Sequence, residues 1–142
     1  MGSEMCIRDR DGIKDGVVTG SLNHYAFGAV CGFLWRRVIG IDALEPGFKA
    51  IAFRPLVDPR LPGAAGTYES AMGRIACAWR RTGDGLAIDV TVPANATGRI
   101  HLPALPGATV REGRRAISSL ERTATEAIVQ VGSGSYAFTV TA

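Results

Sequence analysis

The sequence predicts a mainly β protein: an antiparallel β-sandwich of jelly-roll type, preceded by one buried α-helix. Two patterns in the 142 residues support this fold class. From Pro46 onward, apolar residues recur at every second position in short runs separated by glycines and prolines, which is typical of sandwiches and barrels. Before Pro46 lies one long apolar segment flanked by helix start and stop signals.

The first ten residues predict no packed element, because MGSEMCIRDR shows no periodicity. This stretch also resembles peptides translated from sequencing adapters at the ends of assembled contigs. We therefore expect residues 1–10 to be a non-native leader, so that Met1 is not a native start and the natural sequence begins near Asp11. Residues 11–20, DGIKDGVVTG, are expected to form a loop because of their glycines.

A helix is expected from Leu22 to Val38 or Ile39. Ser21 offers a hydroxyl to cap its N-terminus, and Gly40 is placed to end it. The residues of this segment are apolar on almost every face of the expected helix. A helix that is apolar on all sides is usually buried. No other segment of the chain has a comparable helical pattern, so we expect the partners that bury this helix to lie upstream.

Period-two alternation predicts about eight short strands after this helix. The strongest signal is a hairpin, in which two alternating runs are joined by Thr82-Gly83-Asp84-Gly85. Residues 41–48 are expected to link the helix to the sandwich. The expected strands comprise residues 48–54, 65–70, 74–80, 86–92, 98–102, 108–112, 126–131 and 135–141.

Composition and charge exclude several classes of protein. With 46% hydrophobic and 20% charged residues the chain is of ordinary globular composition, not disordered or collagen-like. The net charge is +3, but the basic residues are scattered singly or in pairs, so no nucleic-acid partner is expected. The longest apolar segment, Tyr25 to Trp35, is much shorter than the ~20 residues needed to cross a bilayer, so no membrane partner is expected.

The three cysteines, Cys6, Cys31 and Cys77, suit neither a disulfide framework nor a metal site, because their number is odd and their spacing wide. Cys31 and Cys77 lie in apolar patterns and are expected to be small buried residues. Unpaired cysteines favour a reducing, cytoplasmic location.

Few residues are candidates for chemistry. His24 lies in the first turn of the expected helix, where it is either a hydrogen-bonded core residue or a donor to a ligand at the mouth of a helical barrel. His101 alternates with Ile100 and Leu102, so it is expected to point away from the core into solvent. The Asn95-Ala96-Thr97 sequon is interpreted as a turn.

The carboxylates include no credible acid and base pair, because none has the apolar surroundings that raise the pKa of a general acid. Those considered are Asp11, Asp15, Asp42, Glu45, Asp84, Asp89, Glu112, Glu121 and Glu126.

The chain from Asp11 to Thr141 resembles the C-terminal end of bacterial α-L-rhamnosidases of glycoside hydrolase family 78. The most specific parts are the Asn-His-Tyr helix start and the Pro-Gly-Phe linker. The segments that carry the resemblance are SLNHYAFGAVCGFLWRRVIGI, EPGFKAIAFRP, GTYESAMGRIACAWRR, LAIDVTVPANATGRIHLP and VGSGSYAFTV.

This resemblance implies that residues 11–45 are the end of an (α/α)6-barrel catalytic domain, with Leu22 to Ile39 as its last inner helix. Residues 46–142 are then the C-terminal β-sandwich domain of the family. The implied parent is an inverting enzyme that removes terminal α-L-rhamnose from glycosides or polysaccharides without a cofactor. The implied partner is a rhamnose-containing glycoside, and His24 matches the histidine that contacts rhamnose.

The implied catalytic residues do not fall within this chain. The general acid of the family lies far upstream. The base is a glutamate in a Trp-Glu-Arg-Trp-Asp-like segment shortly before the helix, and Asp11-Gly12 resembles its end. In that register the glutamate falls near Arg8, and Glu4 has neither the spacing nor the context to replace it. The chain alone is therefore expected to be inactive.

The alternative is a non-catalytic β-sandwich that binds carbohydrate or scaffolds a partner. Such modules commonly present solvent-facing aromatic rings for sugar stacking. Trp79, Tyr136 and Phe138 share strand faces with aliphatic residues and are expected to be buried, which favours a structural role over sugar binding.

Overall fold

The computed structural model describes residues 13–14, 17–18, 26–118 and 120–141. The chain divides into two compact units, residues 1–33 and 34–142. In the first unit, β1 (Ile13–Lys14) pairs antiparallel with β2 (Val17–Val18). The sequence predicted only a loop here, because strands of two residues are too short to show alternation.

The helical segment ends where the sequence predicted. The first unit contains α2 (Ala26–Phe33), and the second opens with η1 (Leu34–Ile39), a wider turn of π-helix. The N–H of Gly40 closes that turn by donating to the carbonyl O of Trp35 at 3.0 Å, and Gly40 has a φ of +88°. Glycine adopts this conformation without a steric penalty, which explains why the helix stops here. The expected start, with Ser21 and Leu22, lies outside the described residues.

The predicted burial of this helix is not found within the described chain. Val30 is 55% exposed, Phe33 51% and Leu34 44%. A helix that is apolar on all sides needs neighbouring elements all around it. At the end of this segment, η1 contacts strands of the sandwich.

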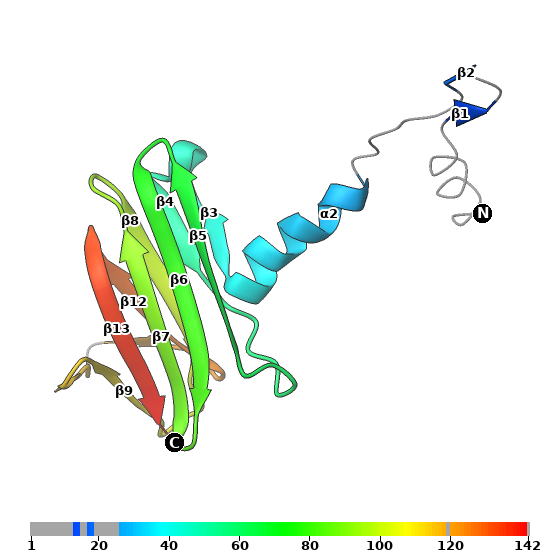
Figure 1. The fold of residues 1–142 in the computed structure, drawn as a ribbon. Coiled ribbons are helices and arrows are strands. Elements are labelled where there is room, and N and C mark those ends of the chain that lie inside the picture. The colour runs from blue at the N-terminus through cyan, green and yellow to red at the C-terminus, as the bar shows by residue number, and fades with distance from the viewer. Residues whose placement is uncertain (1–12, 15–16, 19–25, 119, 142) are drawn as a thin grey trace. The chain divides into compact units, whose positions relative to one another are not determined.

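Two sheets form the second unit. In the six-stranded sheet the order is β10-β9-β13-β7-β6-β5, and in the five-stranded sheet it is β11-β12-β8-β4-β3. Figure 1 shows β13, β7, β6 and β5 in one layer, with β12, β8 and β4 in the layer behind. The strands are β3 (Ile41–Ala43), β4 (Ala50–Phe53), β5 (Gly63–Ser70), β6 (Gly73–Thr82), β7 (Gly85–Val92), β8 (Thr97–Pro103), β9 (Thr109–Glu112), β10 (Arg115–Ala116), β11 (Glu121–Arg122), β12 (Glu126–Val131) and β13 (Gly134–Thr141).

The eight expected strands correspond to β4 to β9, β12 and β13. The sequence missed β3, β10 and β11, each of two or three residues. The segment expected to be a plain linker therefore contains a strand, β3, and a 3-10 turn, η2 (Pro46–Phe48). The boundary at residue 46 stays a prediction.

Pairing is antiparallel throughout the two sheets except between β4 and β8, which run parallel with Ala50 opposite Thr97 and Phe53 opposite Ile100. Two parallel strands cannot be joined by a tight hairpin. The chain between β4 and β8 instead forms β5, β6 and β7 of the other sheet. Local alternation carries no signal for such a pairing.

The core lies between the two sheets and is formed by the alternating apolar residues. In β6, Ile75, Cys77 and Trp79 are buried as predicted, while the residues between them face outward. The hairpin of β6 and β7 has Thr82 opposite Gly85, which leaves Gly83 and Asp84 as its loop. The largest fully buried side chains are Phe53, Phe138, Ile51, Ile75, Ile88, Ile100, Leu102 and Val110.

Candidate functional site

The end of the helix is fixed on the sandwich between the edge strands β3 and β5. The indole Nε1 of Trp79 donates a hydrogen bond to the carbonyl O of Val38 at 2.8 Å. The loop after β4 satisfies two further backbone groups, with Leu56 N–H donating to the Arg37 carbonyl at 2.8 Å and Arg54 N–H to the Gly40 carbonyl at 2.7 Å. The last carbonyls of a helix have no hydrogen-bond donor within the helix. Here the sandwich supplies the donors.

Gly66 on β5 allows the close approach of η1. A Cβ atom on this residue would come within 2.9 Å of Trp35 Cζ3 and closer still to Ile39 Cδ1. Trp35 and Ile39 also pack against the main core, although each is only partly buried. The missing side chain of Gly66 therefore provides the space that these two side chains of η1 occupy.

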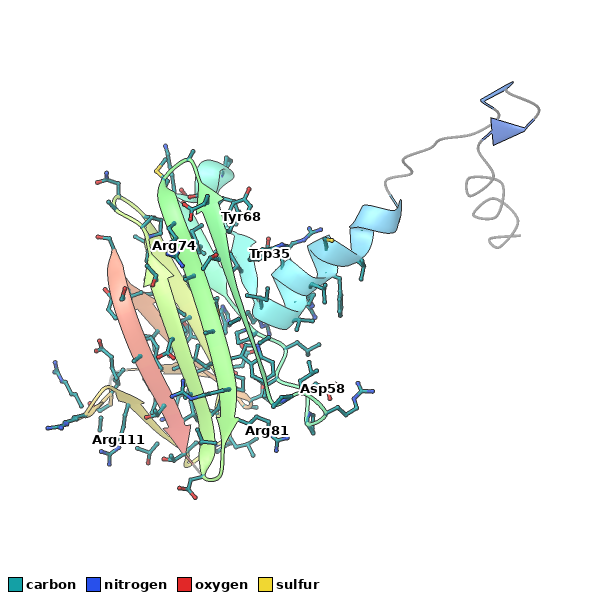
Figure 2. All side chains as sticks on the ribbon, viewed as in Figure 1. Trp35, Asp58, Tyr68, Arg74, Arg81 and Arg111 are labelled. Atoms are coloured by element: carbon teal, nitrogen blue, oxygen red, sulfur yellow. The ribbon has the colours of Figure 1, made fainter. Side chains whose placement is uncertain are left out.

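Tyr68 connects this contact to the Pro-Gly-Phe turn. Figure 2 labels Tyr68 and Trp35. The Tyr68 ring lies 6.1 Å from that of Trp35, in an edge-to-face arrangement at 71°, and 4.9 Å from that of Phe48. Gly47 and Phe48 both have positive φ, 73° and 62°. A positive φ is unusual for a phenylalanine and is held by surrounding packing. The turn thus directs Phe48 towards Tyr68, and we name this contact region, Trp35, Ile39, Phe48, Gly66, Tyr68 and Trp79, the helix seat.

A charged network covers the outer face of the five-stranded sheet. Arg54 donates from Nε and Nη2 to Glu126 Oε1 at 3.0 and 2.8 Å, and His101 Nδ1 lies 2.9 Å from Glu126 Oε2. The three residues come from neighbouring strands, because His101 on β8 lies diagonally opposite Glu126 on β12 and Arg54 follows β4 on the other side.

The prediction that His101 is solvated is wrong. The side chain does point away from the core, but it is only 14% exposed and is paired with Glu126, which is 18% exposed. Partial burial raises the pKa of Glu126, yet the hydrogen bonds from His101 and Arg54 outweigh this effect and hold its pKa below the usual value. An ionised carboxylate can only accept, so Nδ1 of His101 carries the proton.

The other carboxylates are dispersed. Asp89 pairs with Arg80 and Glu121 with Arg99, each at 3.3 Å. Three hollows on the described surface hold a single carboxylate each, Asp89, Glu45 and Glu112. A glycosidase pair needs two carboxyl groups that face one scissile bond, and one of them must be protonated. Glu126, with its lowered pKa, is unsuited to act as that acid.

Several candidate residues lie outside the described residues: His24, Asp11 and Asp15. The rhamnose contact assigned to His24 stays a prediction. Asn95 does lie in a turn, with a φ of +60°, as interpreted from the sequence.

Cys77 is buried as predicted, and burial, with a smaller contribution from Asp89, raises the pKa of its thiol to about 12. The prediction for Cys31 is wrong, since its side chain is exposed. Cys31 lies among apolar residues of a helix, but no other described element packs over that helix and buries them.

Within the described residues, no set of three histidine, cysteine or acidic side chains is arranged to hold a metal ion. Likewise, no helix in the described part of the chain has the length and hydropathy to span a membrane. The two sheets, with a helix end held at their edge, define the class of the described unit as a β-sandwich domain.

The family model for the bacterial α-L-rhamnosidase C-terminal domain matches residues 40–116. The chain therefore belongs to this family. An α-L-rhamnosidase of Formosa agariphila is 36% identical over 83 residues, which cover 58% of this chain and 9% of that protein. An α-L-rhamnosidase of Streptomyces avermitilis is 29% identical over 120 residues, which cover 84% of this chain and 12% of that protein.

Solved structures show the same architecture. An α-L-rhamnosidase structure from Dictyoglumus thermophilum superimposes with a TM-score of 0.79 at 28% identity, over 89% of this chain and 15% of that one. The Streptomyces avermitilis α-L-rhamnosidase complexed with L-rhamnose gives 0.72 at 27% identity, over 91% and 13%. The chain spans between 9% and 12% of the length of the curated relatives it matches.

Proposed function

We propose that this chain is the C-terminal part of an inverting α-L-rhamnosidase that removes terminal α-L-rhamnose from glycosides or polysaccharides. The family match over residues 40–116 supports the assignment. The observation that carries a role for the described residues is the held end of the helix. Trp79 of the helix seat, together with the loop after β4, donates hydrogen bonds to its last carbonyls. In this proposal the sandwich fixes the last helix of a catalytic helical domain.

The catalytic acid and base are proposed to lie upstream of this chain. The dispersed and paired carboxylates of the sandwich support this placement, because pairing with arginine favours the charged form. His24 is proposed to donate a hydrogen bond to rhamnose in the complete enzyme. No cofactor is required by inverting hydrolysis, in which a carboxylic acid protonates the leaving oxygen and a carboxylate activates water.

The first test is to read the source DNA upstream of the codon for Asp11. We expect an open frame that continues into a helical region with a Trp-Glu segment in place of MGSEMCIRDR. A genuine start at Met1 would overturn the enzyme proposal for this chain and favour an accessory sandwich.

The second test compares hydrolysis of p-nitrophenyl α-L-rhamnopyranoside by the 142-residue chain and by the upstream-extended protein. Only the extended protein is expected to release p-nitrophenol. In the extended protein, His24→Ala should raise KM more than it lowers kcat if the histidine only binds the sugar. Turnover by the 142-residue chain would contradict the upstream placement of the acid and base.

A further inference from the structure

A polar hollow of about 480 Å³ lies on the outer face of the five-stranded sheet, where the parallel strands β4 and β8 begin. Its volume is within the range of small-molecule sites. The residues of β4 on this face are small, since Ala50 lies opposite Thr97 and Ala52 opposite Arg99. Their short side chains leave the space of the hollow open. We name this hollow the β4–β8 pocket; its polar lining residues are Glu45, Thr97, Arg99 and Gln130, and its apolar ones include Leu44 and Ala50.

Arg99 lines this pocket and carries an unpaired donor that is buried beneath the surface. Among the side chains that the structure describes, its Nε is the buried nitrogen without a hydrogen-bond partner. Buried donors are normally satisfied, so an orphaned one indicates a missing acceptor. The guanidinium is held only by a 3.3 Å contact from Nη2 to Glu121 Oε2. A small rotation of this long side chain would therefore present Nε–H to a hydroxyl oxygen in the pocket.

The charges around the pocket select against an anionic ligand. Glu45 lines it directly, and Glu121 accepts from Arg99, so two carboxylates accompany one guanidinium. An additional negative charge would be repelled by both carboxylates. A neutral ligand meets no such penalty.

The remaining chemistry suits a sugar ring. Gln130 offers both a donor and an acceptor, as does the hydroxyl of Thr97, and Glu45 accepts. Leu44 and Ala50 provide an apolar side to the same hollow. A pyranose has a rim of hydroxyls, which both donate and accept, around an apolar C–H face. The pocket lining matches both of these features.

We propose that the β4–β8 pocket binds one neutral pyranose residue through Thr97, Arg99 and Gln130. The pocket contains no aromatic ring for stacking, so binding is weak, with a Kd on the order of 1 mM for a ligand of this size. This proposal does not depend on the hydrolytic function proposed above, because it requires only residues of this chain.

The test is an NMR titration of the 142-residue chain, labelled with ¹⁵N, with methyl α-L-rhamnopyranoside, methyl α-D-glucopyranoside and sodium glucuronate. We expect at least one neutral glycoside to shift the amide signals of Thr97, Arg99 and Gln130, and glucuronate to bind at least about five-fold more weakly. The absence of these shifts with both neutral glycosides, at concentrations well above the expected Kd, would overturn the proposal. Tighter binding of glucuronate would do the same.

Two variants locate the contact. Thr97→Val removes one hydroxyl at nearly constant volume, and Arg99→Met removes the guanidinium while retaining a long side chain. Each is expected to weaken binding about five-fold or more. The matched controls, Thr139→Val and Arg111→Met, lie on the other sheet and should leave binding unchanged. Unaltered affinity in Thr97→Val, whose fold is confirmed by its spectrum, would contradict the assignment even if Arg99→Met failed to fold.

Discussion

Trp79 and Val38 are 41 residues apart in the chain, yet the indole N–H of one donates to the backbone carbonyl of the other at 2.8 Å. This bond joins a central residue of β6 to the last turn of the helix. Because Trp79 is itself buried in the core, the position of the helix end is coupled to the packing of the whole sandwich. The contact is therefore one of the links through which the sandwich and the helix end stabilise each other.

Replacing Trp79 with phenylalanine should reduce the stability of the chain. The smaller ring leaves a cavity, and the carbonyl of Val38 loses its donor, so we expect a loss of roughly 1–3 kcal/mol in the free energy of unfolding. Urea denaturation followed by circular dichroism measures this loss. Tyr136→Phe is the control, since its hydroxyl makes only long bonds of 3.3 and 3.4 Å at the surface. Equal midpoints for the two variants would contradict the importance of the Trp79 bond.

Gly66→Ala should disturb the helix seat. Its new methyl group would overlap Trp35 and Ile39, and overpacking of this kind costs about 1–3 kcal/mol. Gly83→Ala is a matched control, because a Cβ there meets nothing within 4 Å. Thermal unfolding should show a lower Tm for Gly66→Ala only. A Tm of Gly66→Ala at or above that of the parent chain would show that η1 can move away without loss.

The acid stability of the chain should depend on Glu126. Its pKa in the folded chain is below the ordinary value of 4.5 because His101 and Arg54 stabilise the carboxylate. The stability from this shift is fully present above pH 4.5 and is lost as pH falls through the lowered pKa. Glu126→Gln should therefore lose less stability than the parent chain between pH 6 and pH 3.

Urea denaturation across this pH range checks the prediction for Glu126. Glu69→Gln serves as the control, since the exposed carboxyl of Glu69 makes no ion pair within the described chain. Its pH dependence should follow that of the parent chain. Identical acid profiles for Glu126→Gln and the parent would refute the role of the network.

The two described cysteines should differ in reactivity towards iodoacetamide. Cys31 is exposed, whereas the thiol of Cys77 is buried and its pKa is raised to about 12. Alkylation proceeds through the thiolate, so at pH 8 Cys31 should be modified and Cys77 protected until the chain is unfolded in urea. Peptide mass mapping separates the two positions. Rapid modification of Cys77 in the native chain would show that β6 is not buried as described.

Local patterns in the sequence determined much of this fold. The alternation of Ile75, Cys77 and Trp79 identified β6 and the face it buries, and Gly40 marked the end of the helix. The side-chain period of a strand and the positive φ of a terminating glycine are properties of a few adjacent residues. The resemblance to α-L-rhamnosidases likewise rested on continuous segments, and the family match confirmed it.

The tertiary structure decided which distant residues meet. The tertiary structure pairs β4 with β8 in parallel, brings Trp35 against Gly66, and makes Arg54, His101 and Glu126 converge. Each of these contacts joins residues from separate elements. His101 was expected in solvent because its neighbours in sequence show only that it faces outward. Whether an outward side chain is solvated or paired depends on the adjacent strands, and strand order is set by the packing of the two sheets as a whole.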